Sequence, residues 1–174
     1  MKKNKLNINY FLRKIYTSKL YQLLPINKTL LKKIIFTSIY KSKHWVRNPN
    51  DLSNEFISVS GPGSNTHSEQ YKDLIKNFNL IIDKYEIKSI IDIPCGDFLW
   101  IKKIIYEKKI KYLGIDIVED LIQVNKNKYQ NENIKFSTGD IVNFKIKEKF
   151  DLVVVRDLLI HLDNTDIKKI LNNL

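Results

Sequence analysis

The chain has 174 residues, of which 43% are hydrophobic, and a formal net charge of +11 at pH 7. This length and apolar content fit one globular domain with a sizeable core and exclude disorder as the state of the whole chain. The single cysteine, Cys95, excludes an intrachain disulfide and suits a reducing compartment.

The positive charge is concentrated at the N-terminal end. Residues 1–50 hold 12 of the 30 basic residues and no Asp or Glu, and the remainder, with 18 basic and 19 acidic residues, is close to neutral. The start of the chain lacks the uninterrupted apolar stretch and the small-residue cleavage site of a secretory signal. No run approaches the roughly 18 apolar residues of a membrane span. We therefore expect a cytoplasmic protein.

Residues 1–43 are predicted to form a basic helical extension of two helices separated at Pro25. In the second helix, apolar residues recur at helical spacing at Leu30, Leu31, Ile34, Ile35 and Ile39. One interpretation is that the extension packs on its own domain and keeps Lys28, Lys32 and Lys33 in water. The other is that it lies on an anionic membrane surface, peripheral to the inner membrane of a bacterium.

Residues 44–66 are predicted to form a loop, because Ser60-Gly61-Pro62-Gly63-Ser64 is a strong turn signal. Residues 67–174 then alternate between helix and strand patterns. The predicted helices span 67–86, 98–109, 118–130 and 164–173, and the predicted strands span 89–93, 112–117, 134–137 and 150–155. This alternation is typical of an α/β fold with a doubly wound parallel sheet covered on both faces.

By the usual order of such sheets, the strands are expected to lie 3-2-1-4. The fourth strand would then be an exposed edge. Val153, Val154 and Val155 would give this edge an apolar border, which invites pairing with another chain and so an oligomer.

Acidic residues follow the first two predicted strands. Asp92 begins the turn after the first strand, and Asp116 ends the second strand, twenty residues beyond Gly96. An acid at this distance from a glycine turn can hydrogen-bond the ribose of a nucleoside. A simpler alternative is that the two carboxylates only cap the helices that follow.

The composition of the first turn distinguishes between nucleotide cofactors. A dinucleotide packs its pyrophosphate against several glycines at a helix start, but this turn has only Gly96. Pro94 lacks an N–H, and Phe98 would crowd a phosphate. S-adenosylmethionine (SAM) has no phosphate, and its cationic amino group suits the carboxylate of Asp92. The turn therefore favours SAM over NAD.

Four blocks of the sequence now resemble a known family. SGPGSN, IPCGDF, GIDIV and VVVRDLLIHL occur in the order found in one bacterial group of class I SAM-dependent methyltransferases, and the resemblance covers roughly residues 35–174. It implies the Rossmann-like class I methyltransferase fold. That fold is expected to have seven strands, and only four are predicted here. The chain is therefore expected to lack the C-terminal part of the fold and to bind SAM weakly.

The resemblance implies a set of cofactor contacts. Asp92, Pro94 and Gly96 would line the methionine end of SAM. Asp116 would bind the ribose, and Ile117 would lie against the adenine.

It also implies contacts from later blocks. Asp140 would accept from the adenine amino group, with Ile141 beside it. Arg156 and Asp157 would face both cofactor and substrate, and the turn around Gly63 would fold over the site as a lid.

His161 is the candidate catalytic base. It lies four residues after Asp157, so on a helical turn the two side chains would share a face. Methyl transfer from a sulfonium to a hydroxyl is an in-line displacement, and a base helps to remove the hydroxyl proton. A structural histidine at a helix start is an equal alternative. Cys95 has no accompanying base pattern, and no cluster has metal-ligand spacing.

The sequence thus predicts SAM-dependent methyl transfer to oxygen. The acceptor suggested by the resemblance is a sugar hydroxyl on a cell-surface glycan or its precursor. One alternative is an RNA methyltransferase with residues 1–50 as a basic arm, although no RNA-binding module is recognisable. The other is a truncated protein that binds SAM without turnover.

Overall fold

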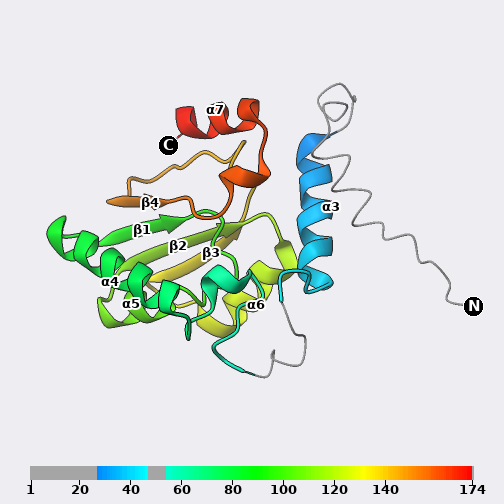
Figure 1. Cartoon of the computed structure of the whole chain (residues 1–174). Helices are drawn as coiled ribbons and strands as arrows, with labels where there is room; N and C mark the ends of the chain where they lie inside the picture. The colour runs from blue at the N-terminus through cyan, green and yellow to red at the C-terminus, as the bar shows by residue number, and fades with distance from the viewer. Residues whose placement is uncertain (1–26, 47–53, 174) are drawn as a thin grey trace, which may run out of the picture.

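The computed structural model describes residues 27–46 and 54–173 (Figure 1), so the predicted helix before Pro25 lies outside the described residues. The elements in chain order are α3 (Lys28–Lys41), η2 (Pro62–Ser64), α4 (Glu69–Lys84), β1 (Ser89–Asp92), α5 (Lys102–Glu107), β2 (Lys111–Asp116), α6 (Glu119–Tyr129), β3 (Ile134–Thr138), β4 (Leu152–Val154), η3 (Leu159–His161) and α7 (Asn164–Asn173). The predicted elements from residue 67 onward are therefore confirmed in type and order.

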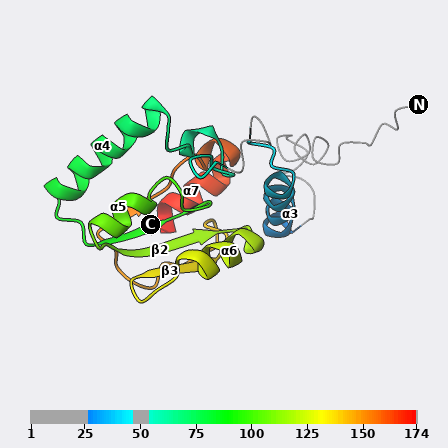
Figure 2. The ribbon, with the colours of Figure 1, turned by 90° about the horizontal axis from the view of Figure 1, so that it is seen from below.

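The described strands form one parallel sheet in the order β3-β2-β1-β4, as predicted. Helices α4, α5 and α6 cover one face, and α7 lies over the other face beside β4 (Figures 1 and 2). Successive strand residues point to opposite faces. Ile90 and Tyr112 therefore enter the core under α4–α6, while Ile91 and Ile115 enter the core that contains Ile170 of α7.

Strand β4 is an edge of the described sheet and pairs only with β1 there. Its residues are half-buried, and Val153 and Val155 pack into the same core as α7. The predicted oligomer through this edge stays a prediction.

Helix α3 is also confirmed, and it stands beyond the carboxyl ends of the strands rather than over a face of the sheet (Figures 1 and 2). The Asn27 side chain caps it by accepting from Leu30 N at 3.0 Å. The expectation that its lysines stay in water is wrong for Lys32, which is 2% exposed because it pairs with acidic side chains of the domain. No helix among the described residues is long and apolar enough to cross a membrane.

The helix after β1 begins four residues later than predicted, because the chain first makes a turn at Phe98. There the backbone is left-handed (φ 65°) and Phe98 N donates to the Cys95 carbonyl at 3.2 Å. The Phe98 ring is fully buried and packs 4.8–5.4 Å from the rings of Tyr112, Tyr129 and Phe136. The expectation that Phe98 would crowd a phosphate is therefore wrong, since its ring belongs to the core.

Phe98→Ala should lower the free energy of unfolding by about 3–5 kcal/mol, because it empties the centre of this aromatic cluster. Urea unfolding followed by far-UV circular dichroism measures the effect. Tyr85→Ala removes a ring that is 62% exposed and should change stability by no more than about 0.5 kcal/mol. Equal losses in the two variants would contradict the central place given to Phe98.

Candidate functional site

A cavity of about 350 Å³ opens at the carboxyl ends of β1, β2 and β4. This volume lies in the range of sites for small organic ligands. The loops after these strands, the loop that contains η2, and α3 all contribute to its wall. The residues predicted from the sequence that line it are Gly63, Pro94, Gly96, Asp116, Ile117, Arg156, Asp157 and His161.

The loops after β1 and β2 are joined by Asp116. Its carboxylate accepts from Gly96 N at 3.1 Å and from Val118 N at 2.9 Å. Gly96 is left-handed (φ 56°), and an added Cβ would lie 2.9 Å from Ser60 Cβ, so glycine is required here. Asp116 thus bonds the N–H of Val118, the N-cap residue of α6, but it does not cap the helix, which has no side-chain cap hydrogen bond. Asp116 also lines the cavity. Burial raises the pKa of Asp116 to about 6, against the backbone N–H groups that lower it.

Asp92 is fully buried at the end of β1 and lies behind the cavity wall rather than in it. Its Oδ2 atom accepts from Tyr112 Oη at 2.9 Å and from Trp100 Nε1 at 3.2 Å. It does not cap α5, whose N-terminus has no side-chain bond. Its Oδ1 atom has no hydrogen-bond partner among the described residues. Burial raises the pKa of Asp92 to about 7, although the Tyr112 bond and the Arg156 charge lower it.

Asp97 fastens the predicted lid to the glycine turn. Its carboxylate accepts from Ser58 Oγ at 2.9 Å and from Val59 N at 2.8 Å, and its own N–H donates to Ser60 Oγ at 2.9 Å. The sequence analysis missed this role because the partners lie 37–39 residues away. The start of the loop that contains η2 is therefore held in place as part of the cavity wall.

Arg156 holds the same loop at a second point. Its guanidinium donates to the Gly63 carbonyl at 3.2 Å and to Ser64 Oγ, and it lies 4.7 Å above the Trp100 ring. It also pairs with Asp157 at 2.9 Å. The Nε atom of Arg156 is buried and has no partner among the described residues. Asp157 itself is left-handed (φ 56°), a conformation that Asp adopts more readily than most other residues.

Three rings form an aromatic wall of the cavity. The ring of His161 lies 6.0 Å from that of Phe36 and 6.1 Å from that of Trp45, and the latter two are 6.4 Å apart. His161 is part of η3, whereas Phe36 and Trp45 come from α3 and the segment after it. Of these three residues, the sequence predicts a site role for His161 only. An aromatic residue inside a basic helix is a signal for Phe36 but not for Trp45, which lies after the helix.

Asp140 and Ile141 lie outside the main cavity. They line a smaller neighbouring cavity of about 30 Å³ that shares Asp116 and Ile117 with the larger one. Burial alone would raise the pKa of Asp140, but hydrogen bonds from Thr29 and Lys32 outweigh it and lower the pKa. The contact of Asp140 with an adenine stays a prediction.

No group of three or more His, Cys, Asp or Glu side chains in residues 27–46 and 54–173 is arranged to hold a metal ion. The polar groups that line the described cavity are carboxylates, one guanidinium, one imidazole, backbone groups, and the hydroxyl, thiol and indole groups of Tyr40, Trp45, Ser60, Ser64, Cys95 and Trp100.

Comparisons with known proteins agree with this architecture. Residues 90–174 match the model of a family described as a methyltransferase domain. The methyltransferase domain of a bacterial Hen1 protein superposes with a TM-score of 0.52 at 17% identity, over 59% of this chain and 58% of that one. The chain has the class I methyltransferase fold.

Two further solved structures extend the likeness. The N-methyltransferase NodS from Bradyrhizobium japonicum WM9, in complex with S-adenosyl-L-homocysteine (SAH), has a TM-score of 0.53 at 20% identity, over 78% of this chain and 65% of that one. A coclaurine N-methyltransferase bound to N-methylheliamine and SAH has a TM-score of 0.50 at 15% identity, over 95% and 54%. This chain thus spans less than two thirds of each of these structures. A search of curated proteins found no match.

The pKa of Asp92 makes stability depend on pH in a defined direction. Because burial raises the pKa of Asp92 from its ordinary value of 3.8 to about 7 in the folded chain, the contribution of Asp92 to the free energy of unfolding falls as pH rises between those values. The stability of the natural chain relative to Asp92→Asn should therefore be greater at pH 5 than at pH 8, as measured by urea unfolding.

Asp73→Asn, which removes an exposed carboxyl on α4, is the control for the loss of one negative charge. If the Asp92→Asn difference is the same at both pH values, or grows with pH, the protonated state of Asp92 is refuted.

Proposed function

We propose that the chain is a SAM-dependent methyltransferase, or the cofactor-binding part of one. The observation that carries the proposal is the bond from Gly96 N to the Asp116 carboxylate at the mouth of the cavity. It joins a turn with one glycine to an acid at the end of the next parallel strand, which is where a nucleoside binds in doubly wound folds. The methyltransferase fold and the matching domain family support this assignment.

Two buried atoms without partners fit the methionine end of SAM. Asp92 Oδ1 is an acceptor and Arg156 Nε is a donor, and both residues contact Trp100. Leaving such groups unpaired in the interior is unfavourable. Arg156 lines the cavity, so the carboxylate of a ligand that carries an ammonium and a carboxylate on one carbon would meet its Nε atom. The ammonium would meet Asp92 only if the part of the wall in front of Asp92 opened. Asp116 would then hold the ribose hydroxyls, and Ile117 would pack on the adenine.

The same residues can position an acceptor. When bound, SAM supplies a methyl group activated by a sulfonium. His161 lies in the cavity wall with its ring against Phe36 and Trp45, where a small acceptor would pack with its apolar face on the rings. The imidazole would take the proton from the acceptor hydroxyl. The Arg156–Asp157 pair would fix the loop over the acceptor.

For the acceptor, we propose a sugar hydroxyl on a glycan or its precursor, which rests on the resemblance of the sequence blocks and on this aromatic wall. A second candidate is an amine, because two of the structural neighbours are N-methyltransferases. Incubation with methyl-labelled SAM and matched hydroxyl and amine acceptors separates the two. Label that enters only amines would overturn the proposed acceptor and leave the cofactor assignment intact. Stoichiometric binding without transfer would indicate a non-catalytic protein.

Asp116→Ala should weaken SAH binding by roughly 1–3 kcal/mol, because ribose hydroxyls and two backbone N–H groups lose an acceptor. Isothermal titration calorimetry measures this directly. Glu132→Ala, which removes an exposed carboxylate before β3, should bind like the natural chain. Asp116→Asn keeps an acceptor oxygen and should lose less than Asp116→Ala. Unchanged affinity in a folded Asp116→Ala chain would refute the ribose contact.

His161→Ala should lower the rate of methyl transfer roughly 10²–10⁴-fold and spare SAH affinity, if the imidazole is the base. Near-normal turnover in the variant would make His161 a structural residue of the aromatic wall.

A further inference from the structure

Helix α3 is attached to the rest of the domain by the buried side chains of Ile35 and Ile39 and by ion pairs. It carries four lysines and no acidic residue. Two of its pairs, Lys33–Glu119 at 2.7 Å and Lys41–Asp120 at 2.8 Å, are exposed. The third attachment is different in kind, because the Lys32 side chain is only 3% exposed.

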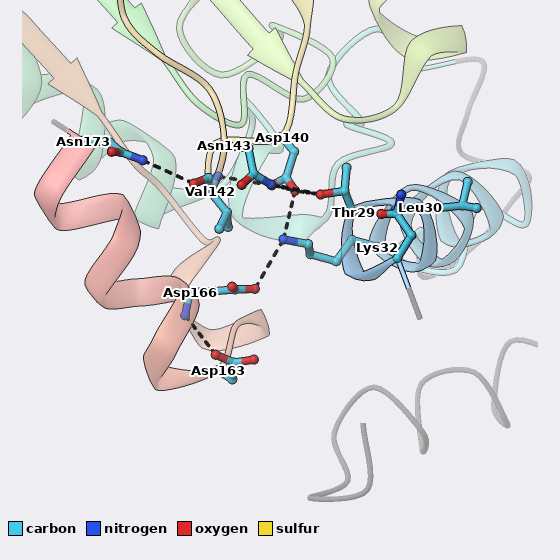
Figure 3. A network of polar contacts seen from close by, with 10 residues as sticks. Thr29, Leu30, Lys32, Asp140, Val142, Asn143, Asp163, Asp166 and Asn173 are labelled. Atoms are coloured by element: carbon cyan, nitrogen blue, oxygen red, sulfur yellow. Dashed lines mark hydrogen bonds and ion pairs between the residues drawn. The ribbon is translucent and has the colours of Figure 1, made fainter. Parts of the chain in front are cut away.

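Lys32 lies between two carboxylates from distant parts of the chain. Its Nζ is 2.9 Å from Asp140 Oδ2, in the segment after β3, and 3.3 Å from Asp166 Oδ2, in α7 (Figure 3). The Asp140 carboxylate also accepts from Thr29 Oγ1 at 2.7 Å, and Asn143 donates to the same Thr29 hydroxyl at 3.0 Å. One ammonium thus ties three segments together at a buried point.

The attachment matters for the site because α3 is part of its wall. Phe36 and Tyr40, one and two turns beyond Lys32, line the main cavity, and Lys32 and Phe36 line the smaller one. Breaking a buried ion pair on one side leaves uncompensated charge, which is strongly unfavourable, whereas exposed pairs contribute little. Among the described pairs of α3, the one made by Lys32 is therefore the contact that decides whether the wall is in place.

We propose that Lys32 is a positioning residue that latches α3 shut over the site, and that release of this latch opens the cavity to its ligand. The inference rests on the proposed function only for the identity of that ligand. It also gives the basic charge of α3 an intramolecular role, since three of its lysines face acids of the same domain.

A thiol placed on the domain-facing side of α3 reports opening directly. Ile39 is 5% exposed and lies seven residues, or two turns, from Lys32. Ile39→Cys should therefore react slowly with a thiol reagent while α3 is docked. The natural thiol, Cys95, is 1% exposed, and the parent chain gives its background rate.

In the Ile39→Cys chain, Lys32→Met should raise the labelling rate constant at least roughly tenfold, because it breaks a buried pair. Lys33→Met, one residue away on the same helix, should change the rate no more than about fivefold, because its pair is exposed. The double variant Lys32→Met/Asp166→Asn should also label fast, since the latch is still absent. In the double variant only one of the two carboxylates remains charged, so fast labelling there cannot come from repulsion between Asp140 and Asp166 and must come from loss of the latch.

Labelling is repeated at low urea concentrations, where opening of α3 alone gives a rate that is nearly independent of urea and global unfolding gives a steep one. Slow labelling in Lys32→Met, equal rates in the Lys32 and Lys33 variants, a slow double variant, or a steep urea dependence would each overturn the latch.

SAH is then added to the natural and Lys32→Met backgrounds. Protection by SAH supports the proposed ligand, and fast labelling in Lys32→Met without any protection would refute that ligand while the latch stands.

Discussion

The site depends on the position of β1 between β2 and β4. All three strands are parallel, but the chain continues from β1 to β2 and β3 on one side and returns to β4 on the other. The loops that leave β1 and β4 therefore diverge and open a crevice at their carboxyl ends. Gly96, Asp116 and Arg156 occupy this crevice from three strands, and the segment that contains Gly63 is held across it.

Charge is buried around the crevice in a way that fits a ligand with charges of its own. Asp92 and Asp116 are both buried with raised pKa values, and Arg156 lowers the pKa of the former. The orphan atoms of Asp92 and Arg156 are opposite in hydrogen-bonding character. A ligand that supplied a partner for each atom would offset their cost to the folded protein, so the features that weaken the empty fold would select a zwitterionic ligand.

The sequence predicted the features that depend on local pattern. Strand and helix periodicity gave the element order, and the order of βα units gave the sheet order. The spacing of Gly96 and Asp116 correctly placed both residues at one cavity, because the carboxyl ends of adjacent parallel strands meet at one edge. The resemblance to the methyltransferase blocks implied the place of Arg156, and the spacing of four residues from Asp157 suggested that of His161.

Contacts between distant segments could not be predicted in this way. Nothing local to Lys32 distinguishes it from Lys33, and its burial depends on Asp166, 134 residues away. The prediction for Phe98 was wrong because a left-handed backbone directs its ring into the core. The periodicity of the sequence does not reveal such a turn. The hydrogen bond from Tyr112 to Asp92 depends on the pairing of β1 with β2. From the sequence alone, Tyr112 is a core residue like its neighbours, with no sign that it bonds a buried acid.

The central claim is that a SAM-type ligand binds where the loops after β1, β2 and β4 meet. Titration of SAH into the isotope-labelled chain, followed by amide NMR, tests it most directly. The account predicts saturable shifts concentrated at Gly63, Gly96 and Ile117, with small shifts in α4, and no comparable response to NAD. Shifts elsewhere on the molecule, equal shifts with NAD, or none with SAH at millimolar concentration would contradict it.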